Sequence, residues 1–257
     1  TTYLWLVIAT IIMAWGVYRH VLLWKKGKSE ICFDKPMTRI HLLFKNVLGQ
    51  ARVLRMRRMR EPQKRSPYAA IMHGFIFYGF MTLFFATTIV ALKDYHIIDL
   101  YHGWFYGFIK ISCQFAGVFL GIGLFMGIFR RSNKELKFKH EIGYSVLYAF
   151  LFVLVLQGFF IQGLRLAIDQ TAPDRPYAFF GLLISKIYPT SLSKETANTL
   201  YSVQWYMHML TTMTFIALIP YTRALHIVTA TLNLFTQRLE PTVKLAKMDF
   251  ENAEADY

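Results

Sequence analysis

Three of the eight histidines in the chain lie within or at the end of long apolar stretches. His73 is near the start of one such stretch, His208 is inside another, and His226 ends that second stretch. Imidazole nitrogen is a common ligand of heme iron and other metals, and ionisable side chains inside apolar segments usually have a function. The two cysteines, Cys32 and Cys113, form no CxxC pair, so the chain carries no zinc or iron–sulfur motif.

The spacing of these histidines predicts a site shared by two helices. His208 and His226 are 18 residues apart, which on a continuous α-helix is five turns, about 27 Å along the axis, with both rings on one face. His73 is expected at the depth of His226 because their helices run antiparallel. One imidazole from each of two neighbouring helices can bind a heme iron from both sides, and a second site could form around His208. The alternative is that each histidine only hydrogen-bonds a neighbouring helix.

Long apolar segments must hold these histidines. Hydrophobic residues make up 55% and charged residues 17% of the 257 residues, which argues against a soluble enzyme and against disorder. A membrane-spanning helix takes about 20 residues. Five segments are long enough, namely residues 2–24, 68–92, 104–129, 142–168 and 201–224. We therefore predict an all-α fold, an integral membrane bundle of five transmembrane helices.

The charges predict how the bundle is oriented. The chain has 29 basic and 15 acidic residues, a formal net charge of +14, and most basic residues gather in residues 25–67, 130–139 and the tail. The positive-inside rule then places the N-terminus outside and the C-terminus in the cytoplasm. We expect a multi-pass protein of a prokaryotic cytoplasmic (inner) membrane. Because the basic residues lie between apolar runs and not over a polar domain, no nucleic-acid partner is expected.

Three segments outside the predicted spans have distinct patterns. Residues 38–60 are predicted to form a basic amphipathic helix along the cytoplasmic surface. Residues 169–200 contain three prolines around a short apolar run, which predicts a lid or re-entrant piece too short to span the membrane. Residues 227–257 become polar and acidic, and we expect them to form a tail or linker towards a partner, after a membrane domain of residues 1–226.

Several arginines lie near the predicted membrane faces and could pair with heme propionates, because guanidinium groups bind carboxylates through two hydrogen bonds. The alternative is that they serve only membrane orientation or extend their charged ends to the membrane surface. These propionate candidates are Arg52, Arg55, Arg165 and Arg223.

Five segments carry a resemblance to a known family. They are GQARVLR at 49–55, MHGFIFYGF at 72–80, QGLRLA at 162–167, YMHML at 206–210 and IPYTRALHI at 219–227. The chain resembles the five-helix cytochrome b of the respiratory nitrate reductase gamma subunit. It resembles more closely the membrane portion of heterodisulfide-reductase-like iron–sulfur oxidoreductases, a group that includes proteins linking electron-transfer flavoprotein to menaquinone.

The resemblance implies two b hemes. His73 and His226 match the ligands of the heme nearer the cytoplasm, and His208 matches a ligand of the outer heme. Nitrate reductase relatives have a further histidine about ten residues along the second span, where this chain has Leu83. We therefore expect His102, or else His96, to be the second outer ligand; the alternative is a single heme with a structural His208.

The function implied by this resemblance is electron transfer between a cytoplasmic iron–sulfur protein, a separate subunit or a fused domain, and a membrane quinone such as menaquinone. Electron-transfer flavoprotein is a further candidate partner, and iron–sulfur clusters are expected only in the partner. The alternative is a membrane anchor or transporter without heme.

Lys110 is the candidate for the quinone site. It stands several residues inside an apolar segment, where an unpaired ammonium group costs about 3 kcal/mol unless it reaches the membrane surface. By its approximate match to a lysine of the nitrate reductase family, Lys110 is expected to hydrogen-bond a quinone carbonyl or a propionate of the outer heme. Asp99 and His102 could share proton transfer there, with residues 169–200 as a cap. Reaching the membrane surface is the alternative role.

Overall fold

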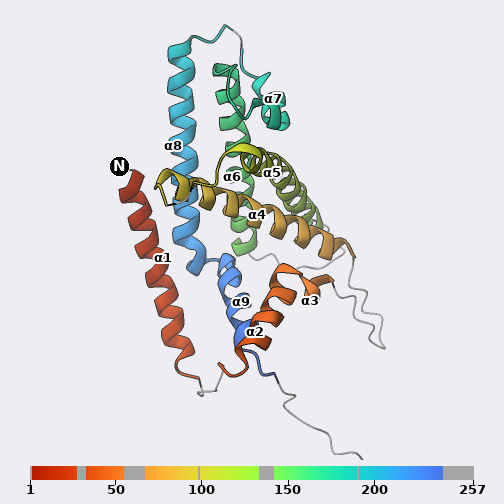
Figure 1. Cartoon of the computed structure of the whole chain (residues 1–257). Coiled ribbons are helices and arrows are strands. Elements are labelled where there is room, and N and C mark those ends of the chain that lie inside the picture. The colour runs from red at the N-terminus through yellow and green to blue at the C-terminus, as the bar shows by residue number, and fades with distance from the viewer. Residues whose placement is uncertain are drawn as a thin grey trace, which may run out of the picture.

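The computed structural model describes residues 2–27, 33–54, 67–97, 99–132, 142–189 and 191–239. Its described residues form helices and connecting turns with no strand, so the prediction of an all-α fold is confirmed for them. Among the described residues, four helices are long and apolar enough to cross a membrane, or five if one bent pair of helices counts as a single span. The four are α1 (Thr2–Trp24), α4 (Pro67–Asp94), α5 (Gly103–Ser132) and α6 (Ile142–Ile168), and they agree closely with four of the predicted spans (Figure 1).

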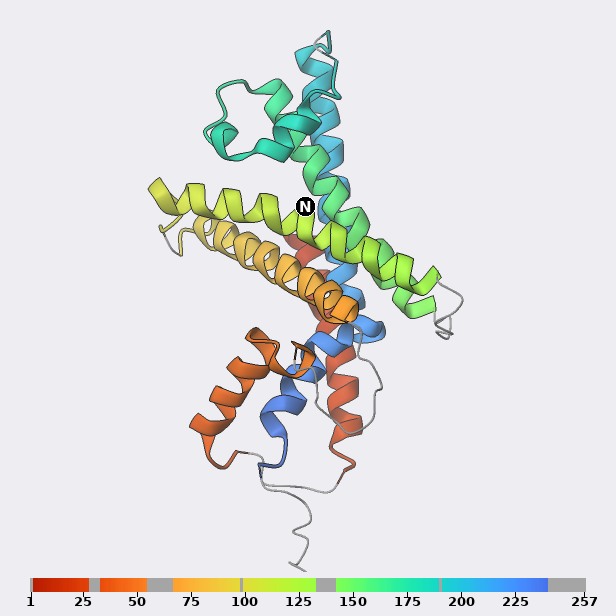
Figure 2. The same ribbon diagram turned by 90° about the vertical axis from the view of Figure 1, so that its right-hand side faces the viewer.

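The long helices do not form a parallel bundle. Helices α1 and α8 (Lys194–Leu218) run roughly along one direction, α6 is tilted against them, and α4 and α5 form a hairpin that runs obliquely across α6 and α8 (Figure 2). The hairpin packs closely because small residues let its backbones approach. A Cβ on Gly79 would lie 2.8 Å from the Ala116 carbonyl oxygen, and one on Gly123 would lie 2.9 Å from the Ile76 nitrogen.

The inner faces of these helices meet in one apolar cluster. Leu124 of α5, Leu151 of α6 and Phe215 of α8 are buried there, with Phe80 of α4 against Phe215. Many other apolar side chains stay exposed on the outer surface; Phe84 and Phe85 of α4 are each 57% exposed. Such surfaces suit contact with lipid chains, which are as apolar as the side chains themselves, so that no apolar surface has to be exposed to water.

The fifth predicted span is not one straight helix. Helix α8 ends at Leu218 and is followed by η4 (Ile219–Tyr221), η5 (Arg223–Leu225) and α9 (His226–Thr236), with a bend of 77° between the two helical parts. Pro220 explains the break because it has no N–H for the helical hydrogen bond and its ring crowds the preceding turn. The expectation that His208 and His226 share one face of a continuous helix is therefore wrong.

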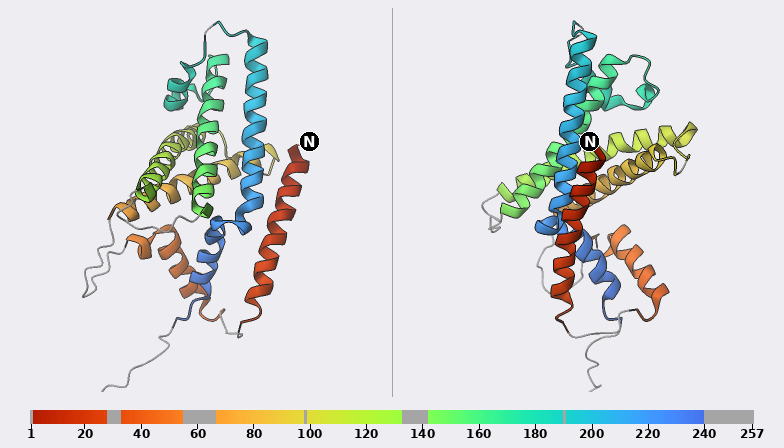
Figure 3. Two further views of the ribbon diagram at one scale, coloured as in Figure 1. Left: turned by 180° about the vertical axis from the view of Figure 1, so that it is seen from behind. Right: turned by 90° about the vertical axis from the view of Figure 1, so that its left-hand side faces the viewer.

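Three short elements gather beside α9: α2 (Pro36–Leu43), η1 (Phe44–Leu48, a π-helix) and α3 (Ala51–Leu54) (Figure 3). The predicted single helix over 38–60 is thus wrong for residues up to 54, because η1 and the left-handed Gln50 (φ 48°) interrupt it. Residues 55–60, including Arg55, lie outside the described residues.

Arg39 joins α2 to α9. Arg39 is only 2% exposed. Its guanidinium donates to two carbonyls at the end of α9, that of Phe235 at 2.7 Å and that of Gln237 at 2.8 Å. It also donates to Asp34 Oδ1 at 2.5 Å, and this hydrogen bond lowers the pKa of the Asp34 carboxyl. Carbonyls at a helix C-terminus lack intrahelical donors, so Arg39 supplies what the end of α9 needs.

The predicted lid is a folded segment between α6 and α8. It contains η3 (Arg175–Tyr177) and α7 (Phe179–Ser185), and α7 is too short to span a membrane, as expected. Helix α8 begins earlier than predicted, at Lys194, where the hydroxyl of Ser193 accepts a hydrogen bond from the Thr196 N–H. The predicted division at residue 226 coincides with the start of α9, and residues 240–257 of the predicted tail lie outside the described residues.

Candidate heme and quinone sites

His73 and His226 lie on two different elements that both contribute to the same apolar cluster. His73 is on the first part of α4, and His226 is the first residue of α9. Ile76 of α4 and Ile227 of α9 both pack against the apolar cluster around Phe215, and the His226 ring is exposed. The His73 ring is half-buried and stacks on Phe77 with 6.3 Å between centroids. The bend after Pro220 turns α9 away from the direction of α8.

The hydrogen bond of His226 leaves one ring nitrogen available as a ligand. Its Nδ1 lies 2.6 Å from the Arg223 carbonyl oxygen, and since a carbonyl only accepts, Nδ1 carries the proton. The lone pair of a neutral ring is then on Nε2, the form in which metal-bound histidines are commonly held by a backbone carbonyl.

His73 and His208 each have a buried Nδ1 without a hydrogen-bond partner. Leaving a buried polar group unpaired costs about 1–3 kcal/mol, so buried imidazoles usually have partners. Within the described residues, no side chain or carbonyl hydrogen-bonds either ring. A Cβ on the next residue, Gly74, would meet no atom within 4 Å.

This donor set fits a heme better than a bare metal ion. In the described part of the chain, no group of three or more His, Cys, Asp or Glu residues could hold a metal. Two facing imidazoles suffice where a macrocycle supplies the other four iron ligands. His73 and His226 are the candidates for such a pair, from two different elements.

His102 and His96, the expected outer ligands, both lie in exposed connecting segments. His102 Nε2 donates to the Asp99 carbonyl at 2.9 Å on an exposed turn, and His96 is an exposed residue with a left-handed backbone (φ 56°). No hydrogen bond or ring contact of the described residues joins either of them to His208. Only His208 therefore retains the features of a candidate outer ligand, a half-buried ring with an unpartnered Nδ1.

Lys110 lies in a cluster of buried charge. Its Nζ is 3.5 Å from Oδ2 of Asp174, which also accepts from the Arg165 guanidinium. The Asp174 side chain has no exposed surface, while the Lys110 and Arg165 side chains are 26% and 31% exposed. The Lys110 ammonium lies 6.0 Å from the centroid of the Tyr101 ring and 5.4 Å from that of the Tyr106 ring.

Burial favours the neutral form of Asp174, but the hydrogen bond from Arg165 and the charges of Lys110 and Arg165 outweigh it and lower the pKa of this carboxyl. Asp174 is therefore an anion between two cations, and the cluster holds a surplus of one positive charge. Its Oδ1 atom is buried and has no partner, so one acceptor remains.

A polar contact between helices also holds α7 in place. Gln114 of α5 is 3% exposed and donates to Gln162 of α6 at 2.8 Å. Its side-chain oxygen accepts from the N–H groups of Phe180 and Gly181, at 3.1 and 3.3 Å. The first N–H groups of a helix lack intrahelical acceptors, so Gln114 caps α7 from another helix.

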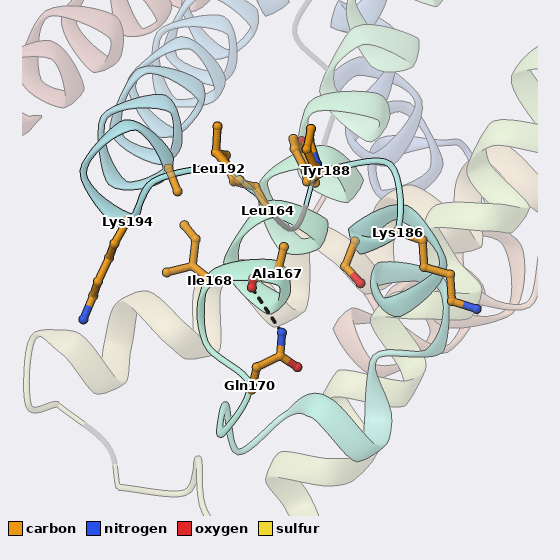
Figure 4. A pocket seen from close by; sticks show the side chains of 11 residues that line it. Leu164, Ala167, Ile168, Gln170, Lys186, Tyr188, Leu192 and Lys194 are labelled. Atoms are coloured by element: carbon orange, nitrogen blue, oxygen red, sulfur yellow. Dashed lines mark hydrogen bonds between the residues drawn. The ribbon is translucent and has the colours of Figure 1, made fainter.

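A cavity of about 550 Å³ lies between the end of α6, α7 and the start of α8 (Figure 4). Leu164, Ile168 and Leu192 line it together with Gln170, whose amide donates to the Ala167 carbonyl at 3.2 Å. The predicted cap thus encloses space, but the lining residues do not include Lys110.

The three described arginines among those proposed for propionates all have protein partners. Arg165 pairs with Asp174, and Arg52 donates to the Gln237 side chain. Arg223 lies over the Tyr144 ring, 5.3 Å from its centroid, and Arg55 lies outside the described residues.

Sequence reasoning missed Asp174 and Gln114. An acidic residue beside prolines in a loop carries little signal, but Lys110 and Arg165 inside apolar segments need an anion, and Asp169 and Asp174 were the nearby acids. A glutamine in the middle of an apolar segment likewise indicates a polar contact between helices.

The model of the nitrate reductase gamma subunit family matches residues 84–243. The chain belongs to this family. The match includes His208 and His226, whereas His73 lies before it. With its several apolar helices, this member of the family is a multi-pass membrane protein.

Two relatives extend the comparison. The chain is 29% identical over 265 residues to the EtfAB:quinone oxidoreductase of Syntrophomonas wolfei subsp. wolfei, covering 98% of this chain and 35% of that protein. It is 26% identical over 205 residues to a subunit of the dihydromethanophenazine:CoB–CoM heterodisulfide reductase of Methanosarcina barkeri, covering 77% of this chain and 66% of that protein. The chain thus spans about a third of the length of the first relative. The family and both kinds of relative predicted from the sequence motifs are confirmed, and no solved structure matches the chain.

Proposed function

We propose that the chain is a membrane cytochrome b unit that transfers electrons between an iron–sulfur partner in the cytoplasm and a membrane quinone. The observation that carries this proposal is the pair of imidazoles from α4 and α9, with His226 held in the ligand tautomer and His73 without a protein hydrogen bond. Histidines of a simple anchor or transporter would be expected to hydrogen-bond neighbouring helices, and neither His73 nor His208 does so within the described residues.

His73 and His226 would hold the heme b nearer the cytoplasm, and His208 would hold a second one. Bound heme supplies one-electron chemistry, whose potential depends on axial ligands and burial. The protein itself would fix the orientation of the His73 and His226 rings. The Arg223 carbonyl holds the tautomer of His226, Phe77 supports the ring of His73, and the apolar cluster around Phe215 excludes water from the space between the helices.

The proposed orientation places α2, α3 and α9 in the cytoplasm and α7 outside. These elements lie at opposite ends of the molecule (Figure 1). The end with α2, α3 and α9 carries most of the described basic residues outside the long helices, which supports a cytoplasmic location in a prokaryotic membrane. An iron–sulfur partner, as a subunit or as a fused domain, would meet the heme held by His73 and His226 from this side.

The relatives' names support the two ends of the electron path. One is an EtfAB:quinone oxidoreductase and the other a subunit of a heterodisulfide reductase that uses dihydromethanophenazine. By analogy, we propose menaquinone or another quinone as the membrane substrate and electron-transfer flavoprotein as a further candidate partner. Residues 227–257 would lead towards the partner.

The quinone site is proposed at the opposite end, around Lys110. A quinone carbonyl needs a donor and a quinol hydroxyl needs an acceptor. Lys110 Nζ is a donor, and the unpartnered Oδ1 of Asp174 is an acceptor in the same cluster. Residues 169–189 cover this region, and Asp99 and His102 lie on the turn before α5, where they could exchange protons with water.

Heme content of single variants tests the proposal. We expect His73→Ala and His226→Ala each to remove about half of the heme from purified protein made in a heme-supplied host, because each leaves one site with a single strong ligand. Reduced-minus-oxidised absorption and heme per chain measure this loss. His41→Ala is the matched control, since His41 is an exposed histidine on α2. Unchanged heme in both His73→Ala and His226→Ala would refute the assignment.

A further inference from the structure

Helix α1 contacts the break between α8 and α9 at three successive points. Gly16 faces the Pro220 ring, His20 bonds the Pro220 carbonyl, and the Tyr221 hydroxyl reaches back to Ile12 of α1. The break lies directly before His226 in the chain. Nothing in the proposed electron path itself requires α1, so these contacts need a separate explanation.

The absence of a side chain at Gly16 allows the close approach. A Cβ at this position would lie 2.7 Å from Cβ of Pro220 and 2.9 Å from the Tyr221 ring. Real Cβ atoms do not come this close to other atoms, so any other residue would push α1 away from the break. Gly16 is buried although it lies on a helix whose other surfaces are largely exposed.

His20 satisfies a carbonyl that the break releases. In a continuous helix the Pro220 carbonyl would accept from the Ala224 N–H. Here that N–H instead donates to the Thr222 hydroxyl at 3.3 Å. The His20 ring lies with Nε2 at 2.9 Å from the Pro220 oxygen, and because a carbonyl only accepts, Nε2 is the donor. The bond joins residues far apart in sequence and holds the break from outside.

The Tyr221 hydroxyl adds the third contact. It donates to the Ile12 carbonyl at 3.2 Å, one turn before Gly16, where a glycine leaves the backbone of α1 uncovered. One face of α1 therefore holds Pro220 and Tyr221 in three ways. Gly16 packs against both residues, His20 donates to the Pro220 carbonyl, and the Ile12 carbonyl accepts from the Tyr221 hydroxyl. Hydrogen bonds between membrane helices favour one helix arrangement over others, so together these contacts can select one arrangement of the bend.

We propose that α1 is a brace that fixes the α8–α9 break and thereby the position of His226, with His20 as a positioning residue and Gly16 as its contact point. This inference rests on the proposed role of His226 as a heme ligand. A bend made only by Pro220 would leave the start of α9 free to rotate, whereas a ligand must hold its ring within about 10–20° of the working geometry. The brace removes that freedom without touching the heme site.

The test compares α1 variants in the full chain. Gly16→Ala and His20→Leu should lower heme bound per chain by as much as the half expected to be lost in His226→Ala, or replace the six-coordinate low-spin spectrum with a five-coordinate one. His20→Gln should restore at least half of the loss, because the glutamine amide can also donate to the Pro220 carbonyl. The midpoint potential of the remaining heme is a second readout that a general loss of protein would not move.

Two controls isolate the brace. Gly121→Ala matches the Gly16 substitution at a helical glycine where a Cβ meets no atom within 4 Å, and Ile11→Ala alters a 62% exposed residue of the same helix. Both should keep full heme and an unchanged spectrum. If Gly16→Ala yields no folded protein, the pair His20→Leu and His20→Gln decides.

The outcomes separate the two proposals. Full heme, an unchanged spectrum and an unchanged potential in Gly16→Ala and His20→Leu, while His226→Ala loses heme, would overturn the brace alone. Equal loss in His20→Leu and His20→Gln would also overturn it, because the hydrogen bond would then not be the cause. Full heme in His226→Ala would overturn the proposed function and the brace with it.

Discussion

The two ends of this molecule differ in whether protein groups bond to their polar side chains. Towards the end of the molecule with α9, His73 has a buried nitrogen without a partner, and a second imidazole, His226, begins α9. Near α7, Lys110, Arg165 and Gln114 all bond to protein groups. Polar groups that the protein itself satisfies are most simply explained by structure, whereas those left unpaired indicate a ligand. The contrast thus separates a candidate cofactor site from a set of polar contacts that holds residues 169–189 in place, here called the clasp.

One atom on each side complicates this contrast. His226 in the first region has a protein partner for Nδ1, which leaves its other nitrogen for iron, and Asp174 in the second region has an unpartnered Oδ1. The first region therefore combines orientation with an open ligand position. The second combines a closed ion cluster with one remaining acceptor, which is why we propose it for quinone and not for heme.

The largest effect is expected at His208, which shares the unpartnered nitrogen of His73 but lacks a facing imidazole in the described residues. If it binds the outer heme, His208→Ala should remove about half of the heme and a component spectroscopically distinct from the one lost in His73→Ala. Difference spectra and redox titration of both variants measure this. His41→Ala is again the control. Full heme content in His208→Ala would reduce the chain to a single heme and leave His208 structural.

The next effect is expected from removing the anion of the cluster. Asp174→Leu leaves Lys110 and Arg165 without their partner, which should cost about 3 kcal/mol, the lower end of the range for breaking a buried pair because both cations are partly exposed. Release of residues 169–189 should then expose the backbone after Lys186 to trypsin. Rates of cleavage at Lys186 in Asp174→Leu and wild type measure the change.

Asp169→Leu is the matched control, because Asp169 is an exposed acid that bonds only locally to Thr171. Cleavage at Lys186 equally fast in both variants would mean that the ion cluster does not hold the loop. Heme content should stay at the wild-type level in both, since neither acid lies near His73 or His226.

Much of the fold followed from the sequence, because uniformly apolar segments of sufficient length have few alternatives in a membrane. The break after α8 could also have been predicted, since Pro220 stands inside the fifth segment, but an apolar run hides a bend when only its length is considered. The pairing of His73 with His226 was expected from their depth, although the reason assumed a straight helix that the structure does not have.

Other features depend on contacts that no local pattern contains. Arg39 was one of many basic residues outside the predicted spans, yet it is buried against the end of α9. Asp174 and Gln114 gain their roles only when the segment after α6 folds back onto α5. Distant partners of this kind need the assembled structure, because burial of a polar group is decided by tertiary packing and not by its neighbours in sequence.

A smaller effect on stability, with a large one on turnover, is expected at Lys110. Lys110→Met removes one of two cations but leaves Asp174 paired with Arg165, so the cost should be about 1 kcal/mol or less. If Lys110 donates to quinone, turnover with a quinone analogue should fall at least ten-fold, about 1.4 kcal/mol in the barrier, with heme content unchanged. Steady-state kinetics and heme per chain test both statements.

Lys93→Met is the matched control, because Lys93 is a lysine near the end of α4 that also lies over the Tyr101 ring, at 5.8 Å. Normal quinone kinetics in Lys110→Met with intact hemes would move the site away from this cluster, towards the cytoplasmic end near His73. Equal loss in both lysine variants would point to the Tyr101 surroundings and not to a donor at Lys110.

The smallest effect is expected from pH acting on Asp174. Its pKa is lowered from the ordinary 3.8, and a carboxyl whose folded-state pKa lies below its unfolded value stabilises the fold above the unfolded value. That contribution is lost only as pH falls through the folded pKa. Between about pH 8 and pH 5 the loop should therefore keep constant protection, and weakening should begin below about pH 4.

Hydrogen exchange at the Phe180 and Gly181 amides, corrected for the intrinsic rate, measures this protection because both N–H groups bond Gln114 in the folded loop. Asp174→Asn keeps the size of the side chain but cannot ionise, so its lower protection should not change with pH over the same range. A loss of protection in the wild type between about pH 7 and pH 5 would require a group with a pKa near neutrality. The lowered pKa of Asp174 would then be excluded as the control of the loop, and the clasp would depend on another titrating residue.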